Sequence, residues 1–133
     1  MIKGLSHIGI AVRSLEDALA LFRALGLENS GSEEVPGEMV RVAFLPIGGT
    51  RVELLEPTAP ESPVARFIAK RGAGLHHISL EVDDIRAAMR ELAGRGLELL
   101  SPEPREGAHG TLICFLHPRS AGGVLIELCQ VRQ

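Results

Sequence analysis

A duplicated unit constrains the fold of this chain more than any other sequence feature. The segment GLSHIGIAVRSLEDALALFRALGLE at residues 4–28 aligns without a gap on GLHHISLEVDDIRAAMRELAGRGLE at residues 74–98. The matched positions pair Gly4 with Gly74, Leu5 with Leu75, His7 with His77, Ile8 with Ile78, Ile10 with Leu80, Val12 with Val82, Leu15 with Ile85, Ala18 with Ala88, and GLE at 26–28 with GLE at 96–98. So many matches at one offset predict two modules with the same fold.

Each copy begins with a predicted strand that leads into a predicted helix. Apolar residues alternate in the strand, and apolar residues spaced three or four apart follow in the helix. Ser14 and Asp84 are the expected N-caps, and Gly26 and Gly94 or Gly96 mark the helix ends. The apolar positions are Ile8, Ile10, Val12, Leu15, Leu19 and Phe22 in the first copy, and Ile78, Leu80, Val82, Ile85, Met89 and Leu92 in the second.

Further strands complete each copy. MVRVAFL and TRVELLE are the predicted strands of the first copy, and TLICFL and GVLIELC those of the second, with a weaker return strand near 27–33 and 97–100. The Pro-rich connection PTAPESPVARFIAKRG holds a short helix, with Ser62 as its cap, Pro63 at its first position and Gly72 beyond its end. Each copy therefore has the order βαβββ.

This order predicts an α+β fold, in which two tandem βαβββ modules form a curved mixed sheet around a cleft with the helices outside; the residues that make this a metal-binding cleft are given below. The chain of 133 residues is 45% hydrophobic, which suits one compact domain. We expect a single domain over 1–133, with module 1 at about 1–58, a bridge at 59–73 and module 2 at about 74–133. A cleft between the modules is the default ligand site.

Charge and composition argue against several function classes. The net charge of −3 and the absence of a Lys/Arg-rich run give no general attraction to nucleic acid. The N-terminus resembles neither a signal peptide nor a membrane span, so we expect no membrane partner and a cytoplasmic protein. Cys114 and Cys129 lie in apolar stretches, and in a reducing compartment we expect both to be buried thiols.

Strand alternation selects four polar residues for the inner face of the sheet. His7 lies opposite the apolar residues of its strand, and His77 does the same in the second copy. Glu53 alternates with Val52 and Leu54, and Glu127 alternates with Ile126 and Leu128. Each module therefore contributes one His and one Glu to the inner face, whereas His76 takes the other face.

These four residues predict a metal site. A single His or Glu in a strand is usually exposed or satisfied locally, but two carboxylates buried near one another repel and lose hydration unless a cation binds them. Two imidazoles and two carboxylates suit a six-coordinate divalent ion such as Co²⁺, Mn²⁺, Ni²⁺, Mg²⁺ or Fe²⁺. Two open positions would remain for a substrate that chelates through two oxygens.

The same motifs carry a family resemblance. The stretches LSHIGIAV, VRVAFLPIGGTRVELLEP, GLHHISLEVDDI and GAHGTLICFLHPRSAGGVLIEL resemble the vicinal oxygen chelate superfamily and, within it, the methylmalonyl-CoA epimerase family. The resemblance places the metal ligands at His7, Glu53, His77 and Glu127. It implies a CoA thioester substrate, epimerisation at C2 through a metal-stabilised enediolate, and a homodimer. Among the metals Co²⁺ is favoured, and Zn²⁺ is also possible.

The resemblance implies that Glu127 transfers a proton as well as binding the metal. The second carboxylate found in some relatives falls at Val42, and the preceding stretch is altered to GEM at residues 37–39. Glu38 is a candidate for the second acid/base, as are a neighbouring loop group and a metal-held water. An exposed loop carboxylate is the alternative interpretation of Glu38.

Three alternative functions use the same fold. Glyoxalase I has a similar ligand set and acts on a glutathione hemithioacetal. An extradiol dioxygenase needs three open positions on Fe²⁺, and a fourth protein ligand takes one of them away, which argues against this function. A metal-free protein that sequesters ligands would be expected to stack them on aromatic rings, yet the chain has four Phe and no Trp or Tyr.

Overall fold

The chain forms two compact units in a computed structural model that describes residues 1–132. One unit comprises Met1–Ser6 and the chain from His77 onward, and the other comprises His7–His76. Strands β1 (Ile2–Ala11) and β5 (Gly74–Val82) each contribute residues to both units. The unit boundaries therefore fall within the two corresponding strands of the sequence repeat.

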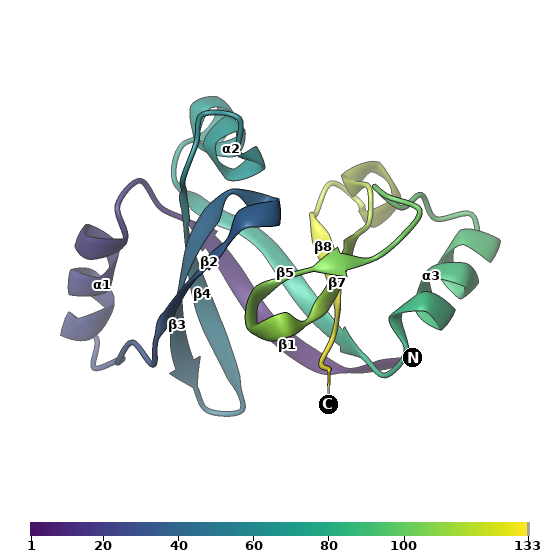
Figure 1. Cartoon of the computed structure of the whole chain (residues 1–133), viewed down its shortest axis with the longest axis horizontal. Coiled ribbons are helices and arrows are strands. Elements are labelled where there is room, and N and C mark those ends of the chain that lie inside the picture. The colour runs from purple at the N-terminus through teal and green to yellow at the C-terminus, as the bar shows by residue number, and fades with distance from the viewer. Residues whose placement is uncertain (133) are drawn as a thin grey trace. The chain divides into compact units, whose positions relative to one another are not determined.

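The unit of residues 7–76 contains the first module and the bridge helix (Figure 1). Beyond β1 its elements are α1 (Leu15–Ala24), β2 (Ser32–Val35), the 3₁₀ turn η1 (Pro36–Glu38), β3 (Val40–Ile47), β4 (Thr50–Pro57) and α2 (Pro63–Arg71). Strands β2, β3 and β4 pair antiparallel, and β4 pairs parallel to β1. Helices α1 and α2 both pack against β4.

The other unit repeats this arrangement. Beyond β5 its elements are α3 (Ile85–Gly94), β6 (Arg105–Glu106), the 3₁₀ turn η2 (Ala108–Gly110), β7 (Leu112–Phe115), the 3₁₀ turn η3 (Pro118–Ala121) and β8 (Ile126–Gln130). Strand β8 pairs parallel to β5 and antiparallel to β7, and β7 pairs with β6. Helix α3 packs against β7 and β8.

The eight named strands follow the order β2-β3-β4-β1-β5-β8-β7-β6. The sheet is mixed, because β1 with β4 and β5 with β8 are parallel and the pairs further out are antiparallel. This topology confirms the predicted α+β class and the βαβββ order of each module.

Helix capping follows the sequence in both modules. The Ser14 hydroxyl accepts a hydrogen bond from the Asp17 amide at 3.2 Å, and the Asp84 carboxylate accepts one from the Ala87 amide at 3.0 Å. Beyond the helices, Gly26 and Gly96 both have φ of +88°, which favours glycine. Among the described residues, no helix is both long enough and apolar enough to span a bilayer.

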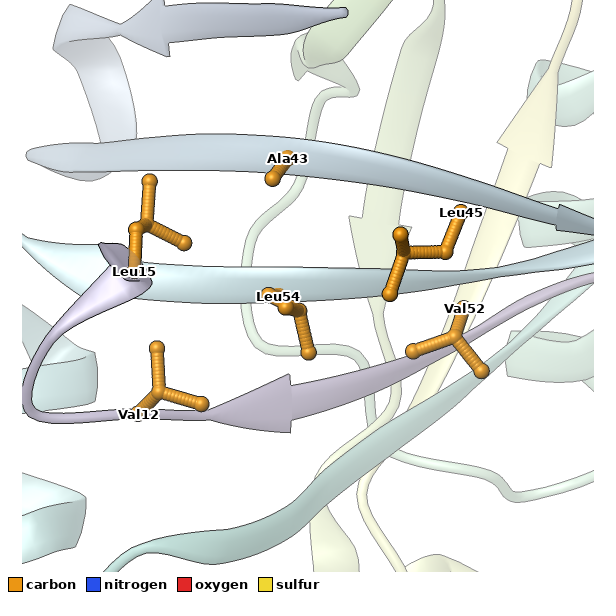
Figure 2. Packing of buried hydrophobic residues seen from close by; sticks show 6 residues of the cluster. All are labelled: Val12, Leu15, Ala43, Leu45, Val52 and Leu54. Carbon is orange, nitrogen blue, oxygen red and sulfur yellow. The ribbon is translucent and has the colours of Figure 1, made fainter. Parts of the chain in front are cut away.

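Each module buries its own apolar cluster between helix and sheet. Figure 2 shows the first of these clusters, in which side chains from the end of β1, the start of α1, β3 and β4 meet. The clusters comprise Val12, Leu15, Ala43, Leu45, Val52 and Leu54 in module 1, and Val82, Ile85, Ala88, Met89, Cys114 and Leu128 in module 2. Because Val52 and Leu54 face α1, strand alternation directs Glu53 to the opposite face.

The return strands differ from the prediction. In module 1 the strand is β2 at Ser32–Val35, later than the expected 27–33. In module 2 only an isolated bridge between Leu99 and Leu116 forms near 97–100, and β6 lies at Arg105–Glu106. Pro102 and Pro104 follow this bridge, and proline donates no hydrogen bond to a strand ladder, which accounts for the interruption.

Both cysteines are buried free thiols, as predicted. Cys114 belongs to the apolar cluster of module 2, and burial raises the pKa of its thiol. Cys129 is 2% exposed in β8. The two residues therefore act as small apolar side chains in the core.

The repeated core predicts matched losses of stability. Leu54→Ala and Leu128→Ala each remove a fully buried side chain at corresponding positions, so each should lower the free energy of unfolding by about 2–5 kcal/mol. Urea denaturation followed by circular dichroism measures the change. Leu21→Ala on α1 is the control, because Leu21 is 60% exposed and its loss should cost less than about 0.5 kcal/mol.

Candidate metal centre

The first module places a histidine beside a glutamate on its inner strands. Strand β1 runs parallel to β4 with Gly9 opposite Glu53, so His7 and Glu53 share one face. The His7 Nδ1 atom lies 3.2 Å from Glu53 Oε2, and both side chains are buried. The pair therefore offers an imidazole nitrogen and a carboxylate oxygen to the same region.

Arg51 also contacts this glutamate. Its Nε and Nη2 atoms lie 2.8 and 2.7 Å from Glu53 Oε2. Burial raises the pKa of Glu53 above its usual value, and the positive charge and hydrogen bond of Arg51 oppose this rise. Arg51 thus supplies a counter-charge to a carboxylate that has lost its hydration.

The second module repeats the His–Glu pair on β5 and β8. Ser79 lies opposite Glu127 in the parallel register, so His77 and Glu127 share a face. The His77 Nε2 atom lies 4.0 Å from Glu127 Oε2, with both side chains buried. The Phe115 ring packs edge-on against the His77 ring, with 5.6 Å between centroids. Phe115 thus covers one side of the site of His77 with an apolar ring.

His76 has different surroundings from its neighbour. Its ring packs edge-on against Phe67 of α2, with 4.8 Å between ring centroids. Burial lowers the pKa of His76 to about 4, because the charged imidazolium would lose hydration. His76 is therefore neutral at pH 7 and packs against the bridge helix.

Glu38 ends the short turn η1 between β2 and β3. It is partly buried, and its Oε1 atom is shielded from solvent. The Ser62 hydroxyl, at the start of α2, donates to the Glu38 carbonyl oxygen at 3.5 Å. Glu38 is thus a turn residue that is partly and not fully exposed.

Val42 stands where the family resemblance leads us to expect a carboxylate in some relatives. It lies two residues before Phe44 on β3, and Phe44 is opposite Glu53, so Val42 faces the same side as Glu53. Val42 is 2% exposed. An apolar, buried group at this position cannot transfer a proton.

The loop histidines shape the backbone. The His117 Nδ1 atom accepts a hydrogen bond from the Arg119 amide at 3.0 Å and caps η3. His109 adopts a left-handed conformation with φ of 57° in η2. The two histidines therefore belong to the turns on either side of β7.

The donor chemistry of each pair fits a divalent metal. Two ligands in adjacent octahedral positions, each about 2.1 Å from an ion, lie about 3 Å apart, and His7 Nδ1 and Glu53 Oε2 are separated by 3.2 Å. His77 and Glu127 offer the same atom types at 4.0 Å. A cation would also offset the burial of both carboxylates.

Arg51 is the residue of this site that sequence reasoning missed. The signal was present, because residues two apart on a strand share a face and Arg51 lies two residues before Glu53. Alternation nevertheless gives only the face of a side chain. Whether a long arginine side chain turns toward solvent or onto a neighbour depends on its packing.

Comparison with known proteins places the chain beside epimerases. Residues 6–115 match the model of the Glyoxalase/Bleomycin resistance protein/Dioxygenase superfamily. The mitochondrial methylmalonyl-CoA epimerase of Homo sapiens is 44% identical over 128 residues, which cover 95% of this chain and 73% of the human protein. An ethylmalonyl-CoA/methylmalonyl-CoA epimerase of Cereibacter sphaeroides is 45% identical over 134 residues, covering 98% of this chain and 100% of that protein.

Solved structures match equally well. A variant of Streptomyces coelicolor methylmalonyl-CoA epimerase in complex with 2-nitronate-propionyl-CoA has a TM-score of 0.96 and 36% sequence identity. The match covers 100% of both chains. The mixed eight-stranded sheet with three helices is thus the fold of methylmalonyl-CoA epimerase structures.

The partly buried, neutral state of His76 predicts a stability that depends on pH. The unfolded chain protonates this residue near pH 6.5 and the folded protein only near pH 4, so acid favours the unfolded state between these values. His76 should thereby reduce the free energy of unfolding by up to about 3 kcal/mol as the pH falls from 6.5 to 4.

Urea denaturation from pH 7.5 to 4 compares the wild-type protein with His76→Leu. The variant should lose less stability on acidification. The difference at pH 7.5 gives the baseline effect of the substitution, because both side chains are then uncharged. Equal losses in the two proteins would contradict the prediction.

Proposed function

The chain belongs to the Glyoxalase/Bleomycin resistance protein/Dioxygenase superfamily, and we propose that it is a metal-dependent epimerase interconverting (R)- and (S)-methylmalonyl-CoA. The observation that carries the proposal is a buried His–Glu pair on corresponding strands of each module. The relatives and the solved neighbour named as methylmalonyl-CoA epimerases support the choice of substrate.

His7, Glu53, His77 and Glu127 are the proposed ligands of one divalent metal ion. Each module contributes one buried imidazole and one buried carboxylate, which are donor types that hold such an ion. When bound, the ion would polarise the substrate carboxylate and thioester oxygens and stabilise the negative charge that develops as C2 loses its proton. Histidine and carboxylate donors without thiolate favour Co²⁺ over structural zinc.

Proton transfer falls to the carboxylates of the chain. Glu127 is buried and its Oε2 atom lies 4.0 Å from His77 Nε2, so its carboxylate is the proposed base toward C2. Epimerisation also needs a donor on the opposite face of C2. Since Val42 carries no proton, Glu38 is the proposed donor, supported by its partial burial and by the anchoring of its backbone to Ser62.

The remaining features of the proposal are a CoA thioester as the small-molecule partner, a homodimer and a cytoplasmic location. The dimer is proposed by analogy with relatives of this fold. Two free, buried thiols suit a reducing compartment. Glyoxalase I activity is not favoured, since both relatives and the solved neighbour are named as epimerases of CoA esters.

Isotope exchange tests the function directly. Protein loaded with Co²⁺ and incubated with (S)-methylmalonyl-CoA in deuterated buffer should exchange and epimerise C2, measured by mass spectrometry and chiral analysis. Ethylmalonyl-CoA measures tolerance for a longer side chain, and methylglyoxal with glutathione tests for glyoxalase activity. Metal-loaded protein that neither exchanges nor epimerises methylmalonyl-CoA would refute the proposal.

The neighbouring histidines provide a matched pair of variants. His77→Ala removes a proposed ligand and should abolish stoichiometric Co²⁺ binding by calorimetry and reduce activity by at least about a thousandfold. His76→Ala removes a group that packs on Phe67, so it should mainly lower the thermal midpoint and leave Co²⁺ stoichiometry intact. The reverse outcome would overturn the strand register.

A further inference from the structure

Both contacts of the Arg51 side chain converge on one carboxylate oxygen. Its Nε and Nη2 atoms lie 2.8 and 2.7 Å from Glu53 Oε2, the oxygen that also lies 3.2 Å from His7 Nδ1. The guanidinium carbon is 5.9 Å from the centre of the Phe44 ring, on the strand that pairs with β4. The carboxylate and the aromatic ring thus hold the guanidinium, although Arg51 is partly exposed.

The second module has no counterpart of this arginine. Leu125 stands two residues before Glu127, at the position where the first module carries Arg51 two residues before Glu53. The arginine is therefore specific to module 1 and is not part of the repeated unit.

We infer that Arg51 is a positioning residue of the metal centre, which fixes the Glu53 carboxylate beside His7 and offsets its charge. This inference rests on the proposed function. The guanidinium adds one positive charge beside the proposed ligand Glu53 and so makes the surroundings of the proposed ion more positive. A positive centre favours a substrate that binds through a carboxylate and gains further negative charge during the reaction.

A purely structural role for Arg51 makes a different prediction. If the guanidinium only supported β4 or Phe44, removing it would change Co²⁺ affinity by the same factor whether residue 53 is charged or neutral. If the guanidinium offsets charge, removing it should impair the metal centre when residue 53 is glutamate. It should strengthen Co²⁺ binding when residue 53 is glutamine, because an arginine without a carboxylate partner repels a metal ion. The sign of the effect therefore separates the two roles.

A double-mutant cycle with Arg51→Met and Glu53→Gln measures this sign, with Co²⁺ affinity determined by calorimetry on the purified full-length protein. Glu53→Gln alone should weaken Co²⁺ binding by about a hundredfold, and adding Arg51→Met should recover at least about tenfold. At saturating Co²⁺, Arg51→Met alone should raise KM for methylmalonyl-CoA by about tenfold. Arg51→Lys should keep KM close to the wild-type value.

Arg41→Met is the matched control, because Arg41 is an exposed arginine of β3 that pairs with Glu34 and Glu56. It removes the same charge and should leave Co²⁺ affinity and KM unchanged, and thermal unfolding checks that every variant is folded. Arg51→Met that weakens Co²⁺ binding, or leaves it unchanged, in the Glu53→Gln background would overturn the inference.

The affinity cycle is independent of the epimerase assay. Co²⁺ binding with the expected recovery but no exchange at C2 would refute the proposed function and support the role of Arg51. Epimerase activity without recovery of Co²⁺ affinity in the double variant would support the proposed function and refute the role of Arg51. A wild-type protein that binds no Co²⁺ would refute both.

Discussion

The parallel pairing between the first and last strands of each module is the constraint on which the rest of the structure depends. It aligns Ile8 with Val52 and Ile78 with Ile126. Alternation from these pairs turns one face of each module toward its helix and leaves one histidine and one glutamate on the other face. A shift by one residue would exchange the apolar core for the polar pair, so packing and chemistry are fixed by one register.

Burial of the carboxylates is the cost of this arrangement, and the two modules meet it differently. Glu53 and Glu127 are each 4% exposed, and a buried carboxylate needs a partner of opposite charge. In module 1 Arg51 supplies part of that charge from the same strand, whereas module 2 has Leu125 at the matching position. The repeat therefore conserves the polar pairs but not the arginine two residues before the glutamate.

Local chemistry made most of the fold predictable. The caps at Ser14, Asp84 and Ser62 and the glycines beyond the helices form as the sequence indicates, because these interactions depend on residues close in the chain. The return strands were less predictable. Near residues 97–100 only one bridge forms, since strand pairing depends on a distant partner and Pro102 and Pro104 interrupt the ladder.

For the candidate site, the sequence by itself determined which side chains share a face, because alternation along a strand is a property of the backbone. Only the tertiary structure decided their contacts: His7 beside Glu53 at 3.2 Å, Arg51 folded onto the same oxygen, and His76 against Phe67. The physical reason is that a long side chain has many rotamers of similar energy, and packing against residues distant in the sequence selects among them.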